Sequence, residues 1–450
     1  MKERSSFTGG LGFVIASAGS AVGLGNLWRF PYLAAQYGGG IFILVYIILA
    51  LTFGFALMTT EIAIGRKTKL SPMAAYKALD SRFGFLCYIA ALVPAIILPY
   101  YCVIGGWVLK YAVVFTTGQG EAAAGDSFFG EFIGGTASPL TYFSIFLVIT
   151  ALIIILGVEK GIEKVSKILM PLLLVITVVI AVYVLTIPGS MDGLKYYLLP
   201  DFSKFSLKTV CAAMGQMFFS MSLAMGIMIT YGSYARDDIS LTKSTNQIEI
   251  FDTVVALLAG LMVVPAVYVF SGEAGLESSG AGLMFITLPK VFAQMSVGKV
   301  IGILFFILVL FAALTSSISI MEAVVSSLMD KFKLTRNKAT GLVLIWSVLL
   351  GVPSSLGNGP LASIQLLGMD FLTFFDFLSN SVLMPIVALC TCILIGWVVG
   401  TDTIVAEVTK NGERLGRKTL YEVVTKYIAP ILLVVILIFY TLAQFGIINY

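Results

Sequence analysis

The stretch SAVGLGNLWRFP, from Ser20 to Pro31, interrupts an otherwise apolar run near the N-terminus. It places closely spaced glycines, an asparagine and an arginine where a membrane-length helix is normally apolar. Because glycine has no side chain to hold helical torsions, such a segment is prone to unwind. Unwound backbone is tolerated at membrane depth only where protein or a water-filled cavity surrounds it. The stretch therefore predicts a broken helix beside an internal site.

The composition places this stretch in a membrane protein. Of 450 residues, 59% are hydrophobic and only 12% are charged, about half the charged fraction of soluble domains. A helical span needs about 20 apolar residues. Eleven such runs lie near residues 11–36, 41–65, 84–116, 139–157, 164–187, 208–234, 245–270, 298–328, 339–356, 371–399 and 425–447. We expect an all-α polytopic membrane protein with one transmembrane domain over 1–450.

The basic residues predict the orientation of these runs. If the N-terminus is cytoplasmic, 21 of the 28 lysines and arginines fall in inner segments, as the positive-inside rule requires. An odd number of spans then makes the C-terminus extracellular, so we expect a multi-pass protein of the cell (plasma or inner) membrane. The net charge of +4 follows from this topology, so we expect no nucleic-acid partner, and no obligate protein partner is evident.

The residue types exclude several classes of enzyme. The chain has no histidine, which excludes a Ser-His-Asp hydrolase and removes the commonest zinc ligand. Its five cysteines fall within or at the ends of the predicted spans, so no disulfide framework is expected. The first apolar run is long and polar-interrupted, unlike a cleavable signal peptide. We expect a protein that is not an enzyme.

Polar residues within the spans indicate where a functional site lies, because charge at membrane depth is costly. Glu61, Asp252 and Asp376 lie in or beside predicted spans. The sixth run contains GQMFFSMSLAMG (215–226), and the eighth contains ALTSSISIME (313–322). Glycine and serine also mediate ordinary helix packing. However, interrupted spans at matching positions of two halves indicate a transporter binding site, and the first and sixth runs are five apart.

Five stretches, in order along the chain, resemble the neurotransmitter:sodium symporter family. They are SAVGLGNLWRFP in the first run, GQMFFSMSL in the sixth, ITYGSY at 229–234, FITLPKVF at 285–292 and LTSS in the eighth. The resemblance covers nearly the whole chain and is strongest to bacterial amino-acid transporters with eleven spans. It implies a LeuT-like fold with inverted repeats at about 8–190 and 205–400, broken helices one and six, and an extra helix at about 425–447.

The resemblance implies an amino-acid site between the two breaks. Broken helices expose N–H groups for a carboxylate and carbonyls for an ammonium. The backbone at Leu24 and Gly25, with the Tyr101 hydroxyl, would bind the carboxylate. The positions implied to line the site are Ser20, Ala21, Leu24, Gly25, Ile97, Tyr101, Phe219, Ser220, Ser222, Ala224, Met225, Ser316 and Ile320. This set is mostly apolar, which favours hydrophobic neutral L-amino acids and leaves open which one. Ala224, often glycine in relatives, is expected to crowd the largest of them.

The same resemblance implies two sodium ions that are transported with the substrate. The first site would use the Ala21 carbonyl, Asn26, Ser220, Asp252 and the carboxylate of the substrate. The second would use the carbonyls of Gly19, Val22 and Ala312 and the hydroxyls of Thr315 and Ser316. A shared carboxylate would couple ion and substrate binding reciprocally. The alternative for LTSS is hydrogen bonding of its hydroxyls to the preceding helical turn.

Chloride is not expected as a third ion. Animal members of the family place asparagine at the position of Asp252 and serine at that of Ala256, and bind chloride nearby. A buried carboxylate beside Ser220 and Gln216 would repel an anion by several kcal/mol at an effective dielectric of about 20. We therefore expect Asp252 to replace the anion.

Charged residues on either side of the site are implied to form gates. An outer ion pair would join Arg29 and Asp376, above a lid of aromatic rings. An inner ion pair would join Arg4 and Asp330, near Tyr234. Closing one pair at a time would alternate access to the site.

Two further features have supporting roles. Glu61 would accept N–H groups that the broken helices release. Gly161 and Pro171, at the start of the fifth span, would let this helix unwind and admit water to the second sodium site; an ordinary helix start is the alternative.

Three other functions remain open at this point. A proton-coupled carrier of the same architecture would lack the second sodium cluster or replace it with a cation, which Thr315 and Ser316 argue against. A channel needs a continuous path, whereas paired gates imply occlusion. A sensor would keep the substrate site but could lose the gates.

Overall fold

The computed structural model describes residues 6–276 and 280–444. Nine of the described helices are long and apolar enough to cross a membrane. A tenth span consists of α1 (Gly10–Ala21) followed by η1 (Gly25–Arg29) and α2 (Phe30–Gln36), bent by 45° at residues 22–24. The described part of the chain has no β-strand, only two isolated bridges. The predicted all-α membrane fold is thus confirmed.

The other spans, apart from the sixth, match the predicted runs to within seven residues at each end. Their helices are α3 (Gly40–Leu49), η2 (Ala50–Gly54) and α4 (Phe55–Thr68); α6 (Gly84–Thr116); α9 (Ala137–Ile155); η4 (Val158–Glu163) and α10 (Lys164–Leu185); α14 (Leu241–Leu276); α16 (Gly298–Phe332); and α17 (Arg336–Leu356). The last two spans consist of α18 (Phe371–Asp376), η7 (Phe377–Leu383), α19 (Met384–Ile393) and η8 (Leu394–Val398), then α21 (Lys418–Val423), η9 (Val424–Ile428) and α22 (Ala429–Gln444). The five cysteines, all in the described residues, form no disulfide.

The predicted sixth run is two short helices, α12 (Leu207–Ser220) and α13 (Ile227–Tyr234), separated by residues 221–226. Neither is long enough to cross a membrane alone. Ser222, Ala224 and Gly226 have positive φ angles of 54°, 59° and 74°. A left-handed residue at every second position cannot continue an α-helix. The second predicted break is therefore present, and its cause is local backbone conformation.

Short helices connect the spans. They are α5 (Pro72–Leu79), η3 (Ser81–Phe83), α7 (Gly120–Ala123), α8 (Phe128–Gly134), α11 (Ser190–Leu198), η5 (Phe202–Lys204), η6 (Leu283–Thr287), α15 (Leu288–Gln294) and α20 (Thr401–Thr409).

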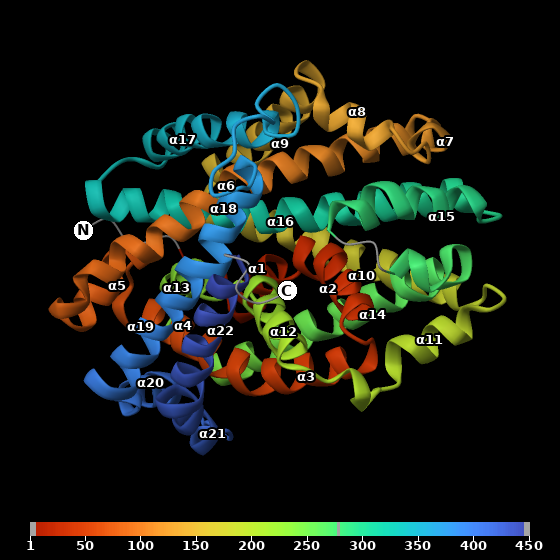
Figure 1. Cartoon of the computed structure of the whole chain (residues 1–450). Coiled ribbons are helices and arrows are strands. Elements are labelled where there is room, and N and C mark those ends of the chain that lie inside the picture. The colour runs from red at the N-terminus through yellow and green to blue at the C-terminus, as the bar shows by residue number, and fades with distance from the viewer. Residues whose placement is uncertain (1–5, 277–279, 445–450) are drawn as a thin grey trace.

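The two breaks lie in the interior of the helix bundle. Figure 1 shows α1 and α2 surrounded by other helices, with the long helices α6 and α16 running alongside one another on one side. Several polar side chains at this depth are buried, among them those of Asn26, Glu61, Ser220 and Asp252. Since buried polar and charged groups are costly at membrane depth, these residues mark a candidate functional region of the fold.

Candidate functional site

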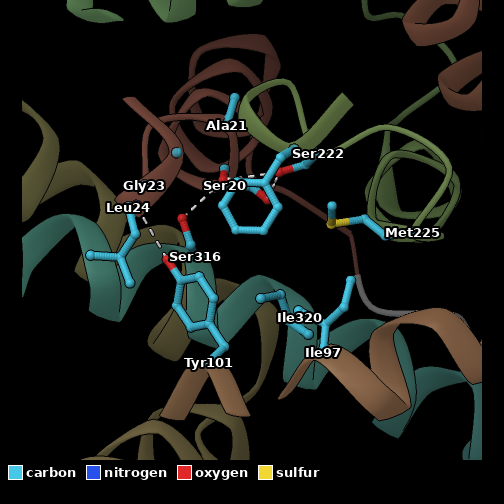
Figure 2. Close-up of a pocket in the computed structure, with 12 residues that line it drawn as sticks. Ser20, Ala21, Gly23, Leu24, Ile97, Tyr101, Ser222, Met225, Ser316 and Ile320 are labelled. Carbon is cyan, nitrogen blue, oxygen red and sulfur yellow. Dashed lines mark hydrogen bonds between the residues drawn. The ribbon is translucent and has the colours of Figure 1, made fainter. Parts of the chain in front are cut away.

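A small cavity lies between the two breaks. It is lined by Ser20, Ala21, Gly23, Leu24, Gly25, Ile97, Tyr101, Phe219, Ser222, Met225, Ser316 and Ile320 (Figure 2). Eleven of the thirteen predicted lining residues are in this set, which draws on both breaks, α6 and α16. Ser220 and Ala224 are not among the lining residues, and Gly23 is an addition.

Hydroxyl groups converge on one carbonyl of the first break. The carbonyl oxygen of Ser20 accepts hydrogen bonds from the hydroxyls of Ser222 and Ser316, each at 3.0 Å. The Ser20 hydroxyl in turn donates to the Ser222 hydroxyl oxygen at 3.1 Å. Figure 2 shows these three side chains pointing toward one another. These two hydroxyl donors occupy both lone pairs of the Ser20 carbonyl oxygen, so an ammonium group would have to displace one of them to be accepted there.

Tyr101 contacts the first break from α6. Its hydroxyl oxygen accepts a hydrogen bond from the backbone N–H of Leu24 at 3.4 Å (Figure 2). The close approach of α16 requires glycine at position 23, because a Cβ there would stand 2.2 Å from the Ser316 hydroxyl oxygen. An N–H and a hydroxyl thus meet at one point of the cavity, as recognition of a carboxylate requires.

A cluster of oxygen atoms lies beside the cavity. The Asp252 carboxylate accepts hydrogen bonds from the side chains of Asn26 at 2.8 Å, Ser220 at 2.9 Å and Tyr46 at 3.0 Å. All four side chains are buried, and Asp252 has no ion pair among the described residues. An anionic carboxylate at this depth requires a cation. Oxygen ligands fit a hard cation such as sodium, and the described residues hold no group of three His, Cys, Asp or Glu for another metal.

Tyr46 is the member of this cluster that the sequence prediction missed. It lies in the middle of the second apolar run, where a tyrosine is hard to distinguish from a packing residue. Ser220, which was predicted to line the substrate site as well, faces Asp252 instead. Its hydroxyl also lies 3.0 Å from that of Tyr46.

The five residues predicted for the second sodium site come from the packed helices α1 and α16. They are Gly19 and Val22 at the end of α1, and Ala312, Thr315 and Ser316 in the middle of α16. The Thr315 hydroxyl donates to the Ala312 carbonyl at 3.1 Å, which is the back-bonding alternative. The Ser316 hydroxyl points into the cavity. Here the sodium assignment stays a prediction.

Glu61 and Gln216 brace the two breaks. Glu61 accepts the backbone N–H of Ala224 at 2.8 Å, the role predicted for it. Gln216 donates to the carbonyl of Gly25 at 2.7 Å, so it supports the first break. Ala224 is fully buried and is not among the residues that line the cavity. The expectation that it crowds the largest substrates stays a prediction.

The predicted outer gate residues lie on opposite helices. The guanidinium of Arg29 lies 5.4 Å from the centroid of the Phe219 ring, which itself lines the cavity. Asp376, at the end of α18, accepts a hydrogen bond from Asn380 at 2.6 Å. An ion pair between Arg29 and Asp376 stays a prediction.

The inner gate is described only in part, because Arg4 lies outside the described residues. Its predicted partner Asp330 accepts a backbone N–H from the loop before α5 at 2.7 Å. Tyr234 donates to the buried carboxylate of Glu322 at 2.6 Å, and Glu322 forms an ion pair with Arg336 at 2.6 Å. This second pair was missed, although Glu322 ends the motif quoted from the eighth run. Its partner lies in a separate helix, so only the fold could reveal it.

The fifth span is helical through the predicted hinge. Gly161 lies in η4, and Pro171 lies inside the continuous helix α10. The unwinding of this segment stays a prediction.

Two helices broken around one buried cavity, next to a cluster of oxygen atoms around a buried carboxylate, are typical of a membrane transporter of small solutes. Comparisons with known proteins identify the family of transporters to which the chain belongs. The chain belongs to the sodium:neurotransmitter symporter family, whose profile matches residues 4–121 and 131–450. This is a family of transporters, so the chain is not an enzyme.

Individual relatives are similar to this chain over most of its length. The crystal structure of MhsT in complex with L-phenylalanine has a TM-score of 0.88 and 35% identity, over 97% of this chain and 99% of that one. YhdH of Bacillus subtilis, named as an uncharacterized sodium-dependent transporter, is 33% identical over 95% of both chains. A sodium- and chloride-dependent taurine transporter of Canis lupus familiaris is 26% identical over 89% of this chain and 72% of its own.

Proposed function

We propose that this protein is a sodium-coupled importer of hydrophobic neutral L-amino acids that works without chloride. The observation that carries this proposal is the cavity, where unwound backbone and a tyrosine hydroxyl meet apolar side chains. Backbone groups would bind the carboxylate and ammonium that all amino acids share. The side chain would then lie among the apolar residues.

The lining of the cavity supports this substrate class. Ile97, Met225 and Ile320 form its apolar part, and no charged side chain is among its lining residues. A charged substrate side chain would therefore be buried without a counter-ion, which is costly. The flexible, polarizable thioether of Met225 suits both aliphatic and aromatic side chains. The similar transporter MhsT has been solved with L-phenylalanine, which fits this class.

Sodium ions would bind at two sites. The cluster of Asn26, Ser220 and Asp252 would take one ion together with the substrate carboxylate, and the end of α1 with α16 would take the second. Since the carboxylate is shared, each ligand would raise the affinity for the other. The number of ions stays part of the proposal.

Alternating access would follow from the two gates. The Arg29 and Asp376 side chains would close the outer side, and Arg4 and Asp330 would close the inner side near Tyr234. The two inverted repeats, the cytoplasmic N-terminus and the extracellular C-terminus belong to this proposal, which basic residues in the inner loops support.

Uptake into proteoliposomes tests the proposal directly. A panel of radiolabelled amino acids is offered with and without an inward sodium gradient. We expect sodium-dependent uptake of leucine, methionine or aromatic amino acids, and none of glutamate or lysine as matched charged substrates. Uptake that is independent of sodium for every substrate would falsify the coupling. Accumulation of glutamate or lysine would disprove the substrate class.

Replacing chloride by gluconate tests the role of Asp252. The parent protein should retain its uptake, because the carboxylate occupies the position where an anion would otherwise balance sodium. The variant Asp252→Asn should gain a chloride requirement. If the parent loses uptake without chloride, the assignment of Asp252 as the anion substitute is wrong.

A further inference from the structure

A second, apolar groove lies on the outside of the bundle, away from the cavity. Its walls come from α5, α6 and α16 and include Met73, Tyr88, Leu92, Ala95, Val324 and Leu328. The side chains of Tyr88 and Leu92 are 55% and 42% exposed. Ser327 also lines the groove, but its hydroxyl donates to the Ala323 carbonyl at 2.7 Å, so its polarity is satisfied. The groove therefore suits an apolar occupant.

One end of this groove is basic. Lys331, one residue before the end of α16, donates from Nζ to the Tyr88 hydroxyl at 3.0 Å and lies 5.0 Å from the ring centroid. Lys77 of α5 lies over Gly84, one turn before Tyr88: a Cβ at Gly84 would stand 3.7 Å from Lys77 Cδ. Both lysines are exposed, and neither forms an ion pair with a described carboxylate. Two available positive charges thus flank the mouth of the groove.

The other end lies deeper in the membrane. The Trp346 indole donates to the carbonyl of Ala95 at 2.8 Å, which lacks a helical donor because Pro99 has no N–H. From Tyr88 to Ala95 the helix rises about 10 Å, within the roughly 15 Å of hydrocarbon in one leaflet. This length suits the upper part of one acyl chain, with its headgroup at the lysines.

We propose that the groove binds one anionic phospholipid, with an acyl chain along α6 and α16 and its phosphate between Lys77 and Lys331. Lipid chains are as apolar as the groove, so the groove surface alone gives no preference over bulk lipid. The preference comes from the two lysines, because basic pockets between membrane helices attract anionic headgroups. The same two helices carry Tyr101 and Ser316, so the lipid would stabilise the scaffold of the substrate cavity.

Native mass spectrometry of the purified full chain tests this site. The protein is titrated with phosphatidylglycerol or with phosphatidylcholine of the same acyl chains. We expect one retained phosphatidylglycerol and no comparable retention of phosphatidylcholine. The double variant Lys77→Gln/Lys331→Gln should bind phosphatidylglycerol roughly tenfold more weakly. The matched control Lys243→Gln/Lys338→Gln, which removes two exposed lysines elsewhere, should bind as the parent does.

A groove-filling variant tests the acyl-chain part. Ala91 also lines the groove, and Ala91→Leu should reduce lipid retention while both lysines remain; its thermal unfolding temperature shows whether it folds. Equal retention of the two lipids by the parent would overturn the proposal, as would unchanged phosphatidylglycerol retention in the double lysine variant. Because no transport is measured, this result is independent of the proposed substrate.

Discussion

The two oxygen clusters proposed for sodium differ in charge and in what holds them. The first contains the buried carboxylate of Asp252, fixed by hydrogen bonds from three neighbouring side chains. The ligands predicted for the second are all neutral. There, the Thr315 hydroxyl donates to a carbonyl of its own helix, and the Ser316 hydroxyl donates to the Ser20 carbonyl.

Because of this difference in charge, we expect the first cluster to dominate sodium affinity. A buried carboxylate without a cation is unfavourable, so binding of a positive ion would stabilise the first cluster strongly. The second depends on carbonyls from α1 and α16, so its geometry changes whenever these helices move. We expect the first cluster to determine the sodium affinity of the protein. Sodium binding at the second cluster should instead depend on the conformation of α1 and α16.

Removing the charge of the first cluster should have the largest effect on sodium-dependent substrate binding. Leaving one partner of a buried charge pair alone costs about 3–5 kcal/mol. The variant Asp252→Ala should therefore weaken sodium-dependent substrate binding roughly 100-fold or more. Equilibrium binding of radiolabelled substrate, measured as sodium is titrated, provides the value.

The control for this prediction is Asp252→Asn, which keeps an oxygen ligand but no charge. We expect its sodium affinity to lie between those of the parent and Asp252→Ala. If Asp252→Ala binds sodium and substrate like the parent, the first cluster is not a cation site.

Removal of the Tyr101 hydroxyl should have the next largest effect, and this effect should be on substrate affinity. A hydrogen bond to a charged group contributes about 1.5–3 kcal/mol, so Tyr101→Phe should weaken substrate binding about 10- to 150-fold. Sodium affinity should fall with it only through the shared carboxylate. A scintillation proximity assay at saturating sodium measures the substrate affinity separately from the sodium affinity. Unchanged substrate affinity would remove Tyr101 from the site.

The sequence predicted both breaks because glycine and serine in an apolar run are a local signal. It missed what depends on neighbouring helices. Tyr46 is indistinguishable from a packing tyrosine until the fold brings it to Asp252. The Glu322–Arg336 ion pair joins two helices. That Glu61 accepts the N–H of Ala224 in particular depends on the left-handed backbone of the second break, which is not visible in the sequence.

The second cluster should be less sensitive to loss of a single ligand. Thr315→Val keeps the shape of the side chain and removes a neutral oxygen, which contributes about 1 kcal/mol. We expect a roughly fivefold higher half-saturating sodium concentration for uptake, with unchanged substrate affinity at saturating sodium. Ser317→Ala is the matched control, because that hydroxyl donates to the Leu314 carbonyl, lies 2.9 Å from the Thr150 hydroxyl and is not a predicted sodium ligand. An effect of Thr315→Val no larger than that of Ser317→Ala would leave the second cluster without support.

The smallest effect should come from a change that touches neither cluster. Ala224 has φ 59°, a left-handed conformation that costs an L-residue about 1–2 kcal/mol. Ala224→Gly removes this strain, so the protein should unfold at a slightly higher temperature, although glycine loses more entropy on folding. Its N–H would still donate to Glu61, and its methyl group does not line the cavity. We therefore expect unchanged sodium affinity and an unchanged ratio of leucine to tryptophan uptake. A shift of that ratio toward tryptophan would mean that the methyl group crowds the bound substrate, and that the sixth-span break moves into the cavity when substrate binds.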